Sequence, residues 1–290
     1  MPNESVAQRR LRENADVAQA THSDLFDYLS NKLHRVSIDG IEYYLAEGDT
    51  LLDADQLRYY ALQRQAEAEA RKAALAADSA GVGTARIRDR SLTAMTQGGR
   101  IVRWKPGTIL TYRVIGATFV NAGDYELVVD CMRKATQEWE STCGVKFQHM
   151  QELDGRPGIS PEGALFAVRE IDTGGRLIAS AFFPNDPKDR RRLIVDPSFY
   201  ATDFDKVGVL RHELGHVLGF RHEHIRSEAP PACPNEDDFD REYLTKYDPT
   251  SVMHYFCGEV GNKLLQISLL DREGARAVYG PPLTSLHFVA

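Results

Sequence analysis

Two long segments of the chain place their hydrophobic residues at the spacing of an α-helix. The first spans residues 122–144, where Gly144 follows the last apolar position and would end the helix. Its apolar positions are Leu127, Val128, Cys131, Ala135 and Trp139. The second spans residues 203–220 and offers Asp205 or Asp203 as its N-cap. We therefore predict two helices, the second of them buried.

Shorter apolar runs around these helices are typical of β-strands. Residues 109–115 partly alternate between apolar and polar positions and are rich in β-forming residues. Further short strands are predicted over 145–150, 164–171, 176–184 and the end of 187–196. This mixture of helices and strands predicts an α+β fold for the chain after about residue 100.

The front third of the chain has a different pattern. Residues 53–77 contain no glycine or proline and are rich in alanine, and Asp53 and Gln56 have the spacing of a reciprocal helix cap. Residues 78–99 are small, polar and glycine-containing, which is typical of a linker. We therefore predict a helical N-terminal segment over 1–97 and a separate domain over 98–290.

Composition and charge exclude some classes of protein. With 42% hydrophobic and 27% charged residues, the 290-residue chain is ordinary for a globular protein. Its formal net charge of -7 argues against general nucleic-acid binding. No apolar run approaches the roughly 20 residues that span a membrane, and the N-terminus does not resemble a signal peptide. We expect neither a nucleic-acid partner nor a membrane partner.

Four cysteines are too few for a disulfide scaffold. A bridge between Cys233 and Cys257 would tie together two segments that flank the candidate site described next. Two buried free thiols explain the same residues, so the sequence leaves the cellular compartment open.

Four of the nine histidines fall within residues 212–224. On a helix, His212 and His216 lie on the same face one turn apart, so their imidazole nitrogens can meet at one metal ion. Glu213 lies one position further round and can reach a water bound to that ion. This pattern indicates two metal ligands and a general base.

Gly219 and His222 extend the pattern. His222 lies six residues beyond His216, so the helix must end before the chain can turn this ring back toward the ion. Gly219 tolerates the positive φ that such a turn requires. Three neutral imidazole ligands leave one tetrahedral position open, which is typical of a catalytic Zn²⁺ site. His224 fits no ligand position, and we expect it to support the surrounding loop.

A second motif lies in residues 247–256, which read YDPTSVMHYF. Together with the histidine motif it resembles the metzincin metallopeptidases, and in particular the astacin family. The segments GFRHEH, SVMHY and SLLDREGARAVYG follow the order found in that family. The resemblance covers roughly residues 100–280, and ASAFFPN is also similar to the edge strand of the related matrixins.

The resemblance implies a metzincin-type catalytic domain of two subdomains, with a mixed sheet, an active-site helix and a C-terminal helix. Met253 would form an apolar floor beneath the histidines. Tyr255 would be a weak zinc ligand that swings away and donates its hydroxyl to the oxyanion. Glu223 matches a glutamate that contacts the mature N-terminus in the family. Taken as residues alone, Met253 and Tyr255 are also compatible with a core, and Glu223 with a solvated surface.

Together these features predict a zinc-dependent endopeptidase acting on protein or peptide substrates. Zinc would polarise a water and the scissile carbonyl, while Glu213 would take the proton from the water and pass it to the leaving amine. The alternative is a catalytically silent zinc-binding interaction module, which the retention of Glu213 disfavours. A metal hydrolase with other substrates is disfavoured by the segment around Met253. The resemblance implies an extracellular location.

The resemblance also implies that the front third is a propeptide. Astacin proenzymes are held inactive by an aspartate in a Phe-x-Gly-Asp stretch. Gly48 and Asp49 match the end of that stretch, whereas Ala46 replaces the phenylalanine. Asp49 would then ligate zinc and keep the protein a zymogen. A tight Gly-Asp turn before the helix at Asp53 explains the same residues.

Two further features bear on substrate and cross-links. Residues 184–193 carry a basic cluster, which is consistent with a preference for acidic substrates or with a solvated loop. Cys143 resembles one half of a long-range family disulfide, but the C-terminal residues offer no partner cysteine. The family disulfide pattern therefore does not transfer.

Overall fold

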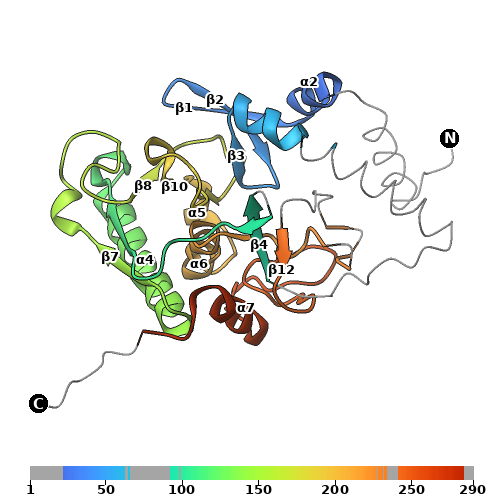
Figure 1. Cartoon of the computed structure of the whole chain (residues 1–290). Coiled ribbons are helices and arrows are strands. Elements are labelled where there is room, and N and C mark those ends of the chain that lie inside the picture. Colours follow the sequence, from blue (N-terminus) through green and yellow to red (C-terminus); the bar gives the residue numbers. More distant parts are fainter. Residues whose placement is uncertain are drawn as a thin grey trace, which may run out of the picture.

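The computed structural model describes residues 22–62, 65, 92–97, 99–226, 228–230, 232–233 and 241–283. The second half of the helix predicted over 53–77 and most of the predicted linker lie outside these residues. Within the described ranges, no helix is both long enough and apolar enough to cross a membrane. The fold is α+β, as the sequence predicted (Figure 1).

A five-stranded sheet has the order β7-β6-β8-β10-β9. Its strands are β6 (Ile109–Val114), β7 (Lys146–His149), β8 (Phe166–Glu170), β9 (Ala179–Ser180) and β10 (Arg192–Val195). The first four strands of this order are parallel, and β9 runs antiparallel to β10 at the edge. Only two residues of the strand predicted over 176–184 form a ladder, because Phe182 and Phe183 after it pack as buried loop residues.

Both predicted long helices are present and pack against each other. α4 (Ala122–Thr142) begins at Asn121, whose side chain accepts the backbone N–H of Asp124. α6 (Lys206–Val217) begins at Asp205, whose side chain accepts the N–H of Gly208. The fully buried Trp139 joins them by donating its ring N–H to the carbonyl of Arg211 at 2.8 Å. This contact fixes α6 against α4.

A second group of strands is built around β4 (Thr93–Gln97). It pairs with β11 (Phe220–Arg221), β12 (Arg241–Tyr243) and the short β5 (Arg100–Ile101). Two helices, α5 (Ser198–Ala201) and α7 (Leu269–Tyr279), complete this part of the chain. The predicted linker therefore ends in a strand, and Leu92 before it is buried in the main core. We propose that the second domain begins upstream of Leu92.

The N-terminal segment is not only helical. It contains α2 (His22–Lys32), a helix over 54–62, and an antiparallel sheet of β1 (His34–Ile38), β2 (Ile41–Ala46) and β3 (Thr50–Leu52). The predicted cap is confirmed, because Asp53 accepts the N–H of Gln56 and Gln56 accepts that of Asp53, at 2.9 and 3.0 Å. The three strands were not predicted, since each is short and carries no long apolar run.

The N-terminal sheet lies beside the large sheet (Figure 1), and the two share a small apolar core. Residues of β1 and β2 on one side meet Leu177 and Ile194 on the other. The buried residues contributed by the N-terminal sheet are Val36, Ile38, Tyr43 and Leu45. Burial of these side chains holds the N-terminal segment beside the candidate site.

Candidate active site

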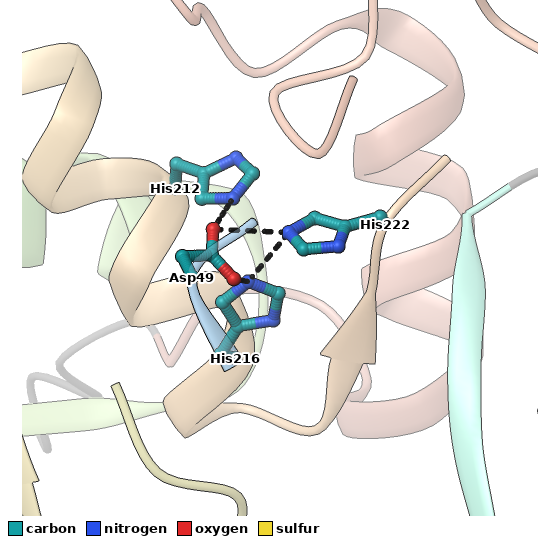
Figure 2. A group of neighbouring side chains, drawn as sticks. All are labelled: Asp49, His212, His216 and His222. Atoms are coloured by element: carbon teal, nitrogen blue, oxygen red, sulfur yellow. Dashed lines mark hydrogen bonds and ion pairs between the residues drawn. The ribbon is translucent and has the colours of Figure 1, made fainter. Parts of the chain in front are cut away.

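Three histidines and one aspartate converge between α6, β11 and the turn after β2 (Figure 2). His212 and His216 come from α6, and His222 follows β11. One ligand atom from each of these rings and from Asp49 lies within 4.8 Å of the others. Gly219 makes this geometry accessible, because its φ of +90° turns the chain back after the helix.

Hydrogen bonds on the outer side of two rings fix their tautomers. Nδ1 of His212 lies 2.8 Å from the carbonyl oxygen of Val252, and Nδ1 of His216 lies 2.8 Å from that of Phe220. A carbonyl can only accept, so each Nδ1 carries the proton and donates it. Each Nε2 is then left with a lone pair that faces the centre. Burial also lowers the pKa of His216 to about 4, which keeps this ring neutral.

The donor atoms of this cluster suit a zinc ion. Three imidazole nitrogens and a carboxylate oxygen are a common tetrahedral set for that metal. The buried Nε2 of His212 has no hydrogen-bond partner in the structure, as expected for an atom whose partner is a metal ion. The Nε2 atoms of His216 and His222 lie 3.1 Å apart, so both face the same centre.

Asp49 closes the side of the cluster that faces the N-terminal segment. Its Oδ2 lies 3.1 Å from Nε2 of His222 and 3.3 Å from Nε2 of His212. Its Oδ1 lies 3.6 Å from Nε2 of His216. Burial alone would raise the pKa of Asp49, but electrostatic attraction, foremost to His222, holds that pKa well below its usual range. The group among the three rings is therefore a carboxylate.

Tyr255 also contacts the Asp49 carboxylate with its hydroxyl. Its hydroxyl donates to Oδ2 of Asp49 and lies 3.1 Å from the carbonyl oxygen of Glu47. The ring passes close to Gly48, where an added Cβ would lie 2.8 Å from Cε2 of Tyr255. Gly48 also has a φ of +82°, so both the turn and the close approach require glycine here.

Glu213 is buried beside the histidines without a partner for one carboxylate oxygen. It is 2% exposed, and its Oε2 has no hydrogen bond. Burial, and then the negative charge of Asp49, raise its pKa well above the ordinary value. Glu213 also lines a pocket of about 310 Å³ together with His212 and Tyr255. A molecule in that pocket can therefore meet this carboxylate.

Glu223 is fully buried, so the solvated-surface interpretation of this residue is wrong. Its carboxylate accepts the N–H of Asp248 at 3.0 Å and lies 3.4 Å from the hydroxyl of Thr93 on β4. Burial raises the pKa of Glu223 to about 8, although the nearby Arg226 opposes this shift. Glu223 thus connects β4 with the loops beneath the histidines.

Two further predicted residues lie around the cluster. Met253 is fully buried, and an added Cβ on Gly215 of α6 would lie 2.3 Å from its Sδ, so the methionine packs directly under that helix. His224 stacks on the ring of Tyr255 at a centroid distance of 4.2 Å. Its Nδ1 accepts the N–H of Tyr255 at 3.3 Å. His224 therefore supports the tyrosine, in line with the expectation for this residue.

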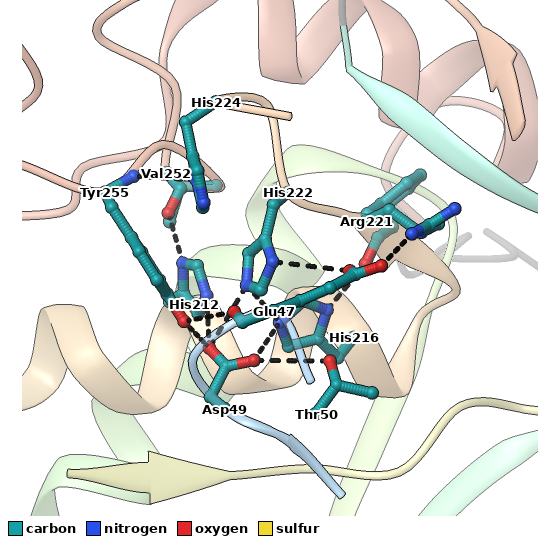
Figure 3. Close-up of polar contacts among 11 residues, drawn as sticks. Glu47, Asp49, Thr50, His212, His216, Arg221, His222, His224, Val252 and Tyr255 are labelled. Atoms are coloured by element: carbon teal, nitrogen blue, oxygen red, sulfur yellow. Dashed lines mark hydrogen bonds and ion pairs between the residues drawn. The ribbon is translucent and has the colours of Figure 1, made fainter. Parts of the chain in front are cut away.

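One ion pair at the site was not predicted. Arg221 on β11 pairs with Glu47 of the N-terminal segment (Figure 3), and both side chains are buried. The other carboxylate oxygen of Glu47 lies 3.6 Å from Nδ1 of His222. The two residues are 174 positions apart in the sequence, so no local pattern could indicate their contact. The sequence showed only that a charged residue, Arg221, stands directly before a candidate ligand, without pointing to its partner.

A disulfide joins Cys233 to Cys257. This settles the choice between a bridge and two free thiols in favour of the bridge. It ties the loop after the third histidine to the loop that follows Tyr255. Cys131 and Cys143 are free and buried, in agreement with the missing partner for Cys143.

Residues 103–229 match the family model of the matrixin peptidases, Peptidase_M10. This range includes α4, the large sheet and the whole histidine motif. The chain is metzincin-like. The metzincin resemblance of the histidine motif is therefore confirmed.

Known proteins similar to this metzincin-like chain are zinc proteases. It is 34% identical over 88 residues to zinc metalloproteinase nas-3 of Caenorhabditis elegans, a match that covers 27% of this chain and 30% of that protein. The solved structure of myroilysin matches 66% of this chain and 100% of its own, with 18% identity and a TM-score of 0.47. High choriolytic enzyme 1, a hatching-enzyme zinc-protease from Oryzias latipes (medaka fish), matches 65% and 99%, with 18% identity and a TM-score of 0.42.

Proposed function

We propose that the chain is a zinc-dependent endopeptidase. The observation that carries this proposal is the position of Glu213, which lies one residue from His212 and beside the three converging histidines. It is a buried carboxylate, and one of its oxygens has no hydrogen bond. His212, His216 and His222 would hold the metal. A zinc ion bound there supplies a Lewis acid that polarises a carbonyl and makes water acidic enough to act as a nucleophile at neutral pH.

The residues around the histidines have separable roles. Glu213 accepts a proton from the attacking water and passes it to the leaving amine, and its raised pKa suits a group that must bind and release a proton. The Tyr255 hydroxyl, which now donates to an oxygen of Asp49, can donate in the same way to the oxyanion of a substrate carbonyl. Met253 packs beneath α6 and holds the helix that carries two ligands.

We infer that the N-terminal segment keeps the enzyme latent. The Asp49 carboxylate lies where a fourth ligand would bind. It also accepts a hydrogen bond from the Tyr255 hydroxyl, which is then not available to a substrate. A substrate carbonyl cannot approach while this carboxylate is in place. Displacement of residues 47–49 from the cluster is therefore required before catalysis.

The alternative function is a silent zinc-binding module. It is favoured by the same carboxylate, because a structural zinc site uses a protein group for its fourth ligand. Glu213 disfavours the silent module. A buried carboxylate without a full set of hydrogen bonds destabilises the fold, and a structural zinc site does not require such a group.

Two substitutions separate these functions. Asp49→Asn in the full chain should raise hydrolysis of casein at least tenfold, because an amide is a weaker zinc ligand than a carboxylate. Adding Glu213→Gln should remove this activity while zinc content stays near one ion per chain. The exposed Glu152 provides the matched control as Glu152→Gln. A silent module would show no hydrolysis in any of these proteins, with or without the Asp49 substitution.

A further inference from the structure

Arg221 marks a charged site next to the histidine cluster. It is 5% exposed, lies directly before His222, and pairs with Glu47 of the N-terminal segment (Figure 3). A guanidinium stays protonated at every accessible pH, so a buried arginine is stabilised by a carboxylate in its surroundings. The planar guanidinium group also matches the two oxygens of a carboxylate in geometry.

The Glu47 carboxylate, which pairs with Arg221, also lies next to the ring of the candidate ligand His222. Asp49 lies 3.1 Å from Nε2 of His222, while Glu47 lies 3.6 Å from Nδ1 of the same ring. Glu47 and Gly48 reach these positions through left-handed backbone, with φ values of +53° and +82°. A peptide that crosses the centre can therefore place a neighbouring side chain on Arg221.

Two more arginines lie further along the same side. Arg190 pairs with Asp53 of the N-terminal segment, and the guanidinium of Arg192 lies 4.6 Å from the ring centre of Tyr43. Both arginines line a pocket of about 380 Å³ together with Arg221. The basic cluster at residues 184–193 is therefore engaged with the N-terminal segment, and it is not simply a solvated loop.

This pocket has one acidic residue from the second domain, Asp186. Its carboxylate accepts the N–H of Phe183 at 2.8 Å and the side-chain amide of Gln56 at 2.7 Å. Burial raises the pKa of Asp186, which disfavours its negative charge. The positive charges of the three arginines therefore exceed the negative charge of Asp186, and the part of the pocket wall that comes from the second domain has a net positive charge.

The opposite side of the cluster is mainly apolar. The pocket next to Glu213 is lined there by side chains such as Leu177, Val209 and Leu265. It carries one basic residue of its own, Arg176, whose guanidinium is hydrogen-bonded to the carbonyl oxygen of Thr173 at 3.1 Å. The two sides of the site thus differ in charge, and the positive balance lies on the side of Arg221.

We propose that Arg221, with Arg190 and Arg192 beyond it, forms a subsite for an acidic side chain of a peptide substrate. This inference rests on the proposed peptidase function. In the full chain Glu47 occupies the subsite as a substitute for the substrate carboxylate. When the N-terminal segment is displaced, a glutamate or aspartate near the cleaved bond takes its place on Arg221.

The test uses the full chain with Glu47→Gln and Asp49→Asn, which removes both carboxylates of the segment from the site. Quenched peptides that differ only by Glu or Gln are compared at each position near the cleaved bond. We expect one position at which the Glu peptide has at least tenfold higher kcat/KM. Arg221→Gln should reduce this ratio below twofold, and Arg221→Glu should reverse it in favour of a Lys peptide.

Three controls keep the result specific to the subsite. Arg221→Lys retains a charge and should keep part of the preference for Glu. The exposed Arg133 on α4 provides the matched substitution Arg133→Gln, which should leave the ratio unchanged. Zinc content and Tm of every variant show whether the fold is intact. A ratio near one at every position, in a protein that cleaves peptides, overturns the subsite and leaves the peptidase function standing.

A binding measurement covers the case in which no peptide is cleaved. Fluorescein-labelled Glu and Gln peptides are titrated into the same protein carrying Glu213→Gln, and anisotropy reports their affinities. Tighter binding of the Glu peptide that disappears with Arg221→Gln supports the subsite, even if the proposed hydrolysis fails. Equal affinities of the two peptides overturn it.

Discussion

Gly48 lies at the closest contact between the N-terminal segment and the catalytic side chains. A Cβ there would lie 2.8 Å from Cε2 and 2.9 Å from the hydroxyl oxygen of Tyr255. The substitution Gly48→Ala should therefore push this turn away from the histidines and raise peptide hydrolysis by the full chain severalfold. A rate assay at fixed protein concentration measures the effect.

Gly40 offers a matched control for this prediction. It has a φ of +78°, close to that of Gly48, but an added Cβ there has no neighbour within 4 Å. Gly40→Ala therefore carries the same backbone strain, about 1 kcal/mol, without the contact to Tyr255. Equal rates for both variants would mean that strain, and not the clash, displaces the turn.

For individual residues, the sequence predicted those positions in the site that follow from the spacing within one segment. His212, His216 and Gly219 are ordered by the helix and its end, so their convergence follows from the periodicity. Asp49 was considered as a ligand only through the family resemblance, and the match lacked the phenylalanine. The pairing of Glu47 with Arg221 could not be predicted, because it depends on how two distant segments dock.

Among the elements, the start of α7 holds the turn that carries Met253. Ser268 and Asp271 form a reciprocal cap, and Asp271 also accepts bonds from the Ser251 hydroxyl at 2.6 Å and the Val252 N–H at 2.8 Å. The carbonyl oxygen of Val252 in turn accepts a hydrogen bond from Nδ1–H of His212. The C-terminal helix is therefore connected to the first histidine by a chain of hydrogen bonds.

Two substitutions should separate capping from this connection. Ser268→Ala removes one cap bond and should lower the free energy of unfolding by about 1 kcal/mol. Asp271→Ala leaves several buried donors unpaired and should cost about 3 kcal/mol. Urea denaturation measures both losses. Only Asp271→Ala should also speed zinc release, measured with a chromogenic chelator; equal release rates would rule out the connection.

The prediction of elements succeeded where the pattern was long and failed where it was short. α4 and α6 have several turns of periodic residues, and both were predicted. Asp205 was one of the two caps offered for α6, whereas the cap of α4, Asn121, was not predicted. β4 was assigned to a linker, because its five residues are mostly small or polar and only their pairing with β11 and β12 makes them a strand. β1 to β3 were missed because each is short, and short ladders form through tertiary contacts.

In the molecule as a whole, metal binding should contribute to stability without being required for folding. One apolar core spans both long helices and the large sheet, and it does not depend on the histidine cluster. An ion present at about 100 times its Kd would stabilise the fold by about 2.7 kcal/mol. Removal with a chelator should therefore lower Tm by about 5–10 °C with a cooperative transition remaining. Calorimetry checks this, and loss of the transition would contradict it.

The position of β4 limits where the chain can be divided. β4 is the strand to which β11 and β12 both attach, and β11 leads directly into His222. A truncated protein that starts at residue 98 would lose this shared strand and, with it, the Thr93 hydroxyl that faces Glu223. If the proposed latency is relieved by proteolysis, the cut must fall before Leu92, and the released enzyme would begin with a short segment that already belongs to its sheet.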